Sequence, residues 1–131
     1  MSVLLIGGYW PLVKALKQAL EEEGFGVDVA CDGYEGNRKV HARRYEAVVI
    51  DRKHPREPGP PWLQRWRRAG FPLKVLELTV PGGADESGRC GERDAATRLT
   101  KPFALDDFLA RVRALVRRTP SFPGLFPDTS A

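Results

Sequence analysis

The segment AVVID at residues 47–51 constrains the fold more than any other part of the sequence. Four consecutive apolar residues followed by an aspartate give a strand that is apolar on both faces. Strands of this kind are typical of parallel sheets, in which helices cover both sides, whereas antiparallel strands commonly alternate between apolar and polar residues. The segment therefore predicts a parallel sheet between two layers of helices. Its last residue, Asp51, would lie at the carboxyl edge of that sheet.

The rest of the chain alternates between strand-sized apolar runs and segments with helical periodicity. The other strands are predicted at residues 3–6, 27–30, 74–79 and 97–100. The first helix is predicted to begin near Pro11 and to end before Gly24, and further helices are predicted at residues 34–44, 62–70, 80–97 and 105–118. Gly36 weakens the second helix. Gly88 and Gly91 each cost about 1 kcal/mol relative to alanine, so the fourth helix is expected to be short or frayed.

Five such strand–helix units with right-handed crossovers make an open, doubly wound α/β sheet. Ligands of these sheets bind beyond the carboxyl ends of the strands. In this chain the strand ends are the loop 7–9, Asp51, Thr79 and Lys101. We expect these positions to converge on one site.

Length and composition indicate one globular domain. A chain of 131 residues has room for a single core, which we place at residues 1–118, and the proline-rich residues 119–131 are expected to form a linker or a disordered tail. Neither a membrane span nor a signal peptide is evident, and the distant Cys31 and Cys90 suit a reducing compartment, so we expect a cytoplasmic location. The net charge of +4 is a weak indication of nucleic-acid contact.

Several motifs together resemble the receiver domain of two-component response regulators. They are AVVID, VLELT and LTKPF ahead of ALDDFLARVRALVRR, and ALEEEGFGVDVACDGYEG near the start. The resemblance implies a flavodoxin-like sheet with strand order 2-1-3-4-5. It also implies that Asp51 is the phosphoacceptor and that Thr79 and Lys101 bind the phosphoryl group. The last helix is most similar to the branch that carries a winged-helix DNA-binding domain.

The resemblance also implies a defect at the metal site. Gly8 and Tyr9 stand where the family has an acidic pair that holds Mg²⁺ together with the acceptor aspartate and a backbone carbonyl, here that of Lys53. Mg²⁺ prefers carboxylate oxygens, so we expect no cofactor, or Mg²⁺ bound only weakly. Phosphorylation at Asp51 is then expected to be weak or absent. We expect Tyr9 and Trp10 to fill the space left by the metal and its water.

Two further departures affect charge and switching. Arg98 stands where the family usually has an aromatic residue that reports the state of the threonine, and an arginine cannot enter an apolar pocket cheaply. Arg52 and Lys53 follow the acceptor directly, and either is a candidate to supply positive charge in place of the metal. The glycine-rich fourth helix belongs to the surface with which such receivers dimerise.

The sequence thus predicts an atypical receiver domain that acts in transcriptional control and is not an enzyme. Its expected partners are a histidine kinase or another signalling protein, a second copy of the chain, and DNA only through a fused or partner effector domain; no membrane partner is expected. One alternative is a conventional phosphorylatable response regulator. Another is a module that binds a small ligand or a protein on the same fold, with Tyr9 and Trp10 as an aromatic wall.

Overall fold

A computed structural model describes residues 1–52, 68, 74–80 and 98–117 of the chain. Its elements are, in chain order, β1 (Ser2–Ile6), α1 (Trp10–Glu22), β2 (Gly26–Ala30), α2 (Gly33–Ala42), β3 (Ala47–Asp51), β4 (Lys74–Thr79), β5 (Arg98–Thr100) and α5 (Leu105–Arg117). Each agrees with a predicted element to within two residues at either end. The helices predicted at 62–70 and 80–97 and the tail predicted at 119–131 lie outside the described residues, apart from Arg68 and Val80.

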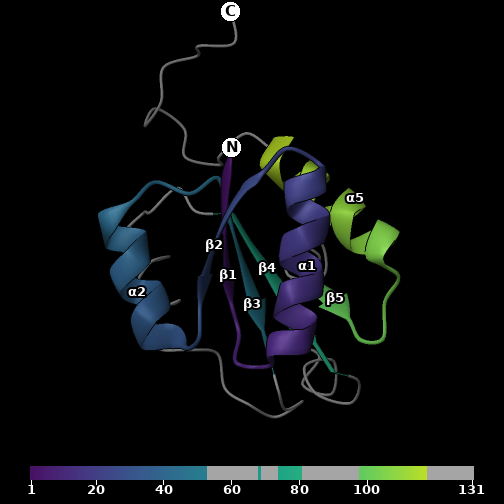
Figure 1. The fold of residues 1–131 in the computed structure, drawn as a ribbon, viewed down its shortest axis with the longest axis horizontal. Helices are drawn as coiled ribbons and strands as arrows, with labels where there is room; N and C mark the ends of the chain where they lie inside the picture. Colours follow the sequence, from purple (N-terminus) through teal and green to yellow (C-terminus); the bar gives the residue numbers. More distant parts are fainter. Residues whose placement is uncertain (53–67, 69–73, 81–97, 118–131) are drawn as a thin grey trace, which may run out of the picture.

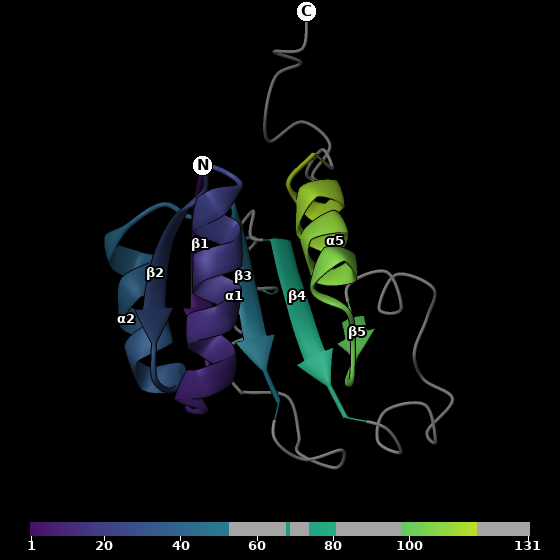
Figure 2. The same cartoon turned by 45° about the vertical axis from the view of Figure 1, so that its right-hand side comes forward.

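The five strands form one parallel sheet in the order β2-β1-β3-β4-β5, as predicted. Figure 2 shows the strand arrows pointing toward the same end of the molecule, so the carboxyl ends of the strands share one edge. Helices α1 and α5 lie on one face of the sheet and α2 lies on the other (Figure 1). This sandwich confirms the doubly wound α/β class.

Two apolar clusters pack the sheet against its helices. One joins β1, β3 and β4 to α1 and α5 and contains the fully buried Phe108, and the other joins the opposite face of the sheet to Val40 of α2. Strand β3 contributes to both clusters, because successive side chains of a strand point to opposite faces. Ala47 and Val49 belong to the first and Val48 and Ile50 to the second, which explains why this strand has no polar face.

The end of α1 has the backbone geometry that the sequence predicts for Gly24. Its φ angle is +94°, in the left-handed region that glycine adopts without a Cβ clash. The Gly24 N–H donates to the Glu21 carbonyl and the Phe25 N–H to the Leu20 carbonyl, the two bonds of a Schellman motif. The motif ends the helix and turns the chain into β2.

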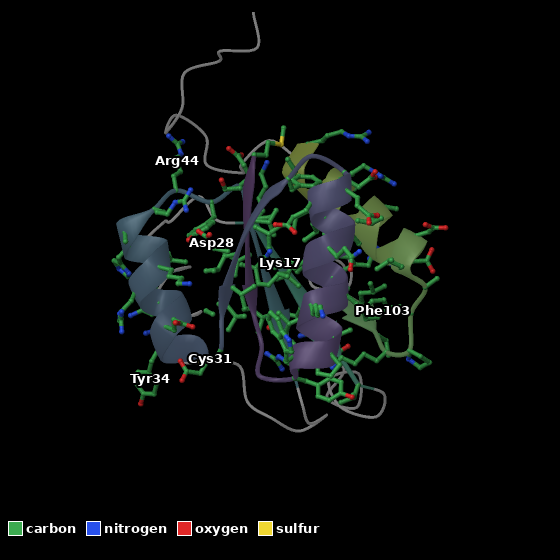
Figure 3. The ribbon with its side chains drawn as sticks, viewed as in Figure 1. Lys17, Asp28, Cys31, Tyr34, Arg44 and Phe103 are labelled. Atoms are coloured by element: carbon green, nitrogen blue, oxygen red, sulfur yellow. The ribbon has the colours of Figure 1, made fainter. Side chains whose placement is uncertain are left out.

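Helix α2 begins with a reciprocal cap. The Asp32 carboxylate accepts a hydrogen bond of 2.9 Å from the Glu35 N–H, and the Glu35 carboxylate accepts one of 2.7 Å from the Cys31 N–H. The bond from Cys31 lowers the pKa of Glu35. Desolvation, followed by the charges of Asp32 and Glu35, raises the pKa of the Cys31 thiol, so the thiol stays protonated at neutral pH. Cys31 and the exposed Tyr34 lie at this end of α2 (Figure 3).

Strand β2 lies at the edge of the sheet and carries a small polar cluster. The Asp28 carboxylate accepts hydrogen bonds of 2.7 Å from the Tyr45 hydroxyl and 2.8 Å from the Arg43 guanidinium. Desolvation, helped by the bond and the charge of Asp28, raises the pKa of Tyr45 to about 12. The cluster therefore ties the chain after α2 to the edge strand.

Gly36, which weakens α2 by sequence criteria, permits the helix to approach β1 closely. A Cβ atom at this position would lie 2.5 Å from Ile6 Cδ1 and 3.0 Å from Ile6 Cγ1. Gly36 and Ile6 are both buried. Glycine at position 36 lowers the helix propensity of α2, but it allows the helix to contact the sheet.

We predict that Gly36→Ala destabilises the protein by about 1 kcal/mol, because overpacking of 1–3 kcal/mol outweighs the gain of about 1 kcal/mol in helix propensity. Ile6→Val removes the Cδ1 atom that the new methyl group would meet. The double variant should therefore be more stable than the sum of the two single effects, as measured by urea unfolding. Strict additivity of the two effects would contradict the close approach.

Candidate functional site

Asp51 and Lys101 meet at the carboxyl edge of the sheet, as their positions at strand ends predict. Asp51 ends β3, and Lys101 directly follows β5. The Lys101 ammonium forms an ion pair with Asp51 Oδ1 and also donates to the Arg52 carbonyl at 3.3 Å. Only 5% of the Asp51 side chain is exposed, against 24% for Lys101. The carboxylate is therefore buried, with a cation held directly against it.

Thr79 lies beside this pair at the end of β4. It pairs with Thr100 of β5, and the two hydroxyl oxygens are 3.4 Å apart. The Thr79 carbonyl accepts a hydrogen bond of 2.7 Å from the Lys101 N–H. The structure thus brings the three predicted phosphoryl-site residues, Asp51, Thr79 and Lys101, to one edge of the sheet.

Gly7 belongs to the loop 7–9 that was expected to join the site, and its position faces Asp51. A Cβ atom on Gly7 would lie 3.0 Å from Asp51 Cβ and 3.6 Å from Asp51 Oδ2. A side chain at position 7 would therefore face the acceptor carboxylate. The backbone after Gly7 continues through Gly8 and Tyr9, the predicted place of the lost acidic pair. A glycine carries no side-chain pattern, and only the approach of β1 to β3 reveals its position.

Tyr9 and Trp10 do not fill a buried space, which corrects the expectation from the sequence. Their exposed fractions are 61% and 55%. Tyr9 is the N-cap of α1 and Trp10 its first residue, so both lie where the chain leaves the sheet and enters the helix. Their rings are available to solvent or to a partner.

Arg52 and Arg98 share one buried partner, Glu77 on β4. Arg52 Nη2 lies 2.8 Å from Glu77 Oε1, and Arg98 Nε lies 3.4 Å from Glu77 Oε2. Arg52, a candidate charge substitute at Asp51, thus directs its guanidinium to Glu77. Lys53, the other candidate and the predicted source of a metal-binding carbonyl, lies outside the described residues.

Glu77 is a residue that the sequence analysis did not select. Its side chain is 5% exposed, as little as that of Asp51. A glutamate between leucines in VLELT is a signal that could have been used, because a buried carboxylate needs a cationic partner. The sequence does not show which cations those are.

Among the described residues, the side chains at this edge do not supply the oxygen ligands that Mg²⁺ prefers. This ion takes octahedral oxygen coordination, commonly with one or two carboxylates. Within residues 1–52, 74–80 and 98–117, no group of three or more Asp, Glu, His or Cys residues is arranged to hold a metal ion. Asp51 is already paired with an ammonium group, and the loop that faces it offers glycine.

The site combines a buried aspartate, a lysine and a threonine at the carboxyl edge of a parallel α/β sheet. Comparison with known proteins identifies the class of protein that has this arrangement. The response regulator receiver domain family matches residues 3–113. The transcriptional regulatory protein CutR of Streptomyces coelicolor is 35% identical over 119 residues, which are 91% of this chain and 55% of CutR. The response regulator MprA of Mycobacterium sp. (strain KMS) is 36% identical over 131 residues, 100% of this chain and 56% of MprA.

Solved structures agree with this class. The receiver domain of Francisella response regulator 1452 superposes with a TM-score of 0.75 at 26% identity, covering 89% of this chain and 97% of that one. An orphan response regulator of H. pylori has the same fold, with a TM-score of 0.74 at 24% identity and coverage of 89% and 97%.

The chain belongs to the response regulator receiver domain family. It is thus a signalling module and not an enzyme, and receiver domains are the partners of histidine kinases in two-component systems. The chain spans about half the length of the curated relatives that it matches, which are regulators of transcription or response regulators by name. No helix among the described residues is long and apolar enough to cross a membrane.

We predict that restoring carboxylates to the β1–α1 loop creates Mg²⁺ affinity. The variants are Gly8→Asp/Tyr9→Asp and, because its Cβ would face the acceptor, Gly7→Asp. At least one should bind Mg²⁺ about tenfold more tightly than the wild type, or about 1.4 kcal/mol, as followed by NMR shifts of the Asp51 and Lys101 amides. Ala15→Asp/Gln18→Asp, which adds the same charge to the exposed side of α1, should not. Equally tight binding by the wild type would contradict the prediction.

Proposed function

We propose that this chain is an atypical receiver domain that regulates transcription through an attached or partner DNA-binding domain, with weak or no Mg²⁺-dependent phosphorylation at Asp51. The observation that carries the proposal is the loop that faces Asp51, which offers Gly7, Gly8 and Tyr9 and no carboxylate. CutR, a transcriptional regulatory protein by name, supports the setting. The family supports a histidine kinase or another signalling protein as the partner.

The chemical argument concerns charge in the transition state. Phosphoryl transfer spreads negative charge over the equatorial oxygens of the phosphoryl group, and catalysis consists almost entirely of positioning and offsetting that charge. At this site Lys101 supplies one positive charge, and Thr79 ends the neighbouring strand β4, where its hydroxyl lies 3.4 Å from that of Thr100. A bound metal ion adds several kcal/mol of stabilisation, and the described residues offer Asp51 without the carboxylates that would help to hold one. Transfer is therefore slowed and not redirected to another chemistry.

A second candidate is a conventional phosphorylatable response regulator. The observation in its favour is that Asp51, Thr79 and Lys101 lie together at the carboxyl edge. A third candidate is a module that binds a ligand or protein through this edge. The exposed rings of Tyr9 and Trp10 support this candidate. We favour the atypical receiver over the conventional regulator because the conventional regulator needs a metal site that the described residues do not provide.

We predict that the wild-type chain, incubated with acetyl phosphate and Mg²⁺, acquires phosphate slowly by intact-mass measurement. The carboxylate-restored variant that binds Mg²⁺ should be phosphorylated about 100-fold faster, equivalent to about 2.7 kcal/mol of transition-state stabilisation. Asp51→Asn in the restored background is the control and should abolish the gain. Rapid, stoichiometric phosphorylation of the wild type at Asp51 would reject the atypical reading in favour of the conventional one.

A further inference from the structure

The most unusual charge arrangement in the described structure is the group of Arg52, Glu77 and Arg98, which we call the charge clamp. Its members come from three adjacent strands: Arg52 directly follows β3, Glu77 lies in β4, and Arg98 begins β5. Glu77 pairs with Arg98 in the sheet register, and Ile50, two residues before Arg52, pairs with Glu77. Alternate residues of a strand share a face, so all three side chains lie on the face that carries α2.

The clamp and the Asp51–Lys101 pair lie on opposite faces of the sheet. Asp51 continues the alternation of Ala47 and Val49, which pack on the other face, under α1 and α5. Arg52 is covalently next to Asp51, and Arg98 lies three residues before Lys101. The Lys101 ammonium contacts both Asp51 and the Arg52 carbonyl. The ends of β3 and β5 are therefore held by charge from both faces of the sheet, with β4 between them.

The stability of the charge clamp depends on the carboxylate of Glu77. Its side chain is 5% exposed, whereas those of Arg52 and Arg98 are 14% and 20% exposed. A carboxylate this buried needs compensation, and two guanidinium groups supply it. If the carboxylate charge is removed, Arg52 and Arg98 lose the shared partner that links them across β4. The carboxylate is thus the group that keeps the strand ends together.

We propose that the charge clamp holds the carboxyl ends of β3, β4 and β5 together as one unit. The positions of the residues around Asp51 then stay the same when the charge of Asp51 changes. Such a change is therefore not transmitted to β5. Glu77 is then a positioning residue for Asp51 and Lys101. This inference rests on the proposed function in one respect, because it concerns the regulation of the same site. Its test does not depend on phosphate.

Two backbone hydrogen bonds report on the clamp directly, and a third serves as a reference. The Arg52 N–H donates to the Leu78 carbonyl at 2.9 Å and the Lys101 N–H to the Thr79 carbonyl at 2.7 Å, on either side of β4. The Gly7 N–H donates to the Ala30 carbonyl at 2.9 Å, between β1 and β2, and reports on the other half of the same edge.

The test measures hydrogen exchange of these amides in Glu77→Gln. We expect exchange at Arg52 and Lys101 to accelerate about tenfold relative to Gly7, because the clamp opens locally. Asp28→Asn, which removes the carboxylate shared by Arg43 and Tyr45 on β2, is the matched control and should leave Arg52 and Lys101 unchanged. Equal acceleration at all three amides, or none, would overturn the proposal. If Glu77→Gln does not fold, Arg98→Gln takes its place under the same criterion.

A second measurement addresses transmission. Asp51→Asn should shift NMR signals of residues next to Asp51 and Lys101 and leave Arg98 and Leu99 of β5 unaffected, whereas in the Glu77→Gln background the shifts should extend into β5. Shifts that reach β5 in the presence of an intact clamp would refute the inference. Rapid phosphorylation of the wild type would refute the proposed function and leave these amide measurements as they are, so the two failures are distinguishable.

Discussion

The ion pair between Asp51 and Lys101 is the interaction on which the functional edge of this domain depends. It joins β3 to the residue after β5 across β4, two strands that are not neighbours in the sheet. A carboxylate this buried would be costly without a cation. Lys101 lies between β5, which has only three residues, and α5, which begins at Leu105. The same lysine therefore belongs both to the site and to the segment that leads into α5.

The fold and the site draw on different residues. The two apolar clusters contain neither Asp51, Thr79 nor Lys101, and they contain no residue of the loop 7–9. Burial of those clusters is the main stabilising term of such a domain. Substitution at the carboxyl edge can therefore change the chemistry of a receiver without removing its fold.

Most of the fold could be predicted from the sequence because its determinants are local. Apolar runs mark β1, β3 and β4, helical periodicity marks α1 and α5, and Gly24 marks a helix end. Asp51 and Lys101 could be paired because parallel strands bring their carboxyl ends together. Glu77 could not be assigned its partners, since Arg52 and Arg98 lie 25 and 21 residues away and only strand register unites them. Tyr9 and Trp10 were expected to fill the space left by the metal and its water, but their place beyond the strand end leaves them exposed.

The two edge strands have a consequence for self-association. Unpaired strand edges are templates for uncontrolled pairing between molecules, which proteins suppress with short strands and with charged groups on the edge. Here β5 has three residues, and β2 carries Asp28, whose carboxylate is engaged by Arg43 and Tyr45. Both edges thus resist the addition of a foreign strand. The sheet is thereby protected against amyloid-like growth, and productive encounters with other proteins are left to helices and loops.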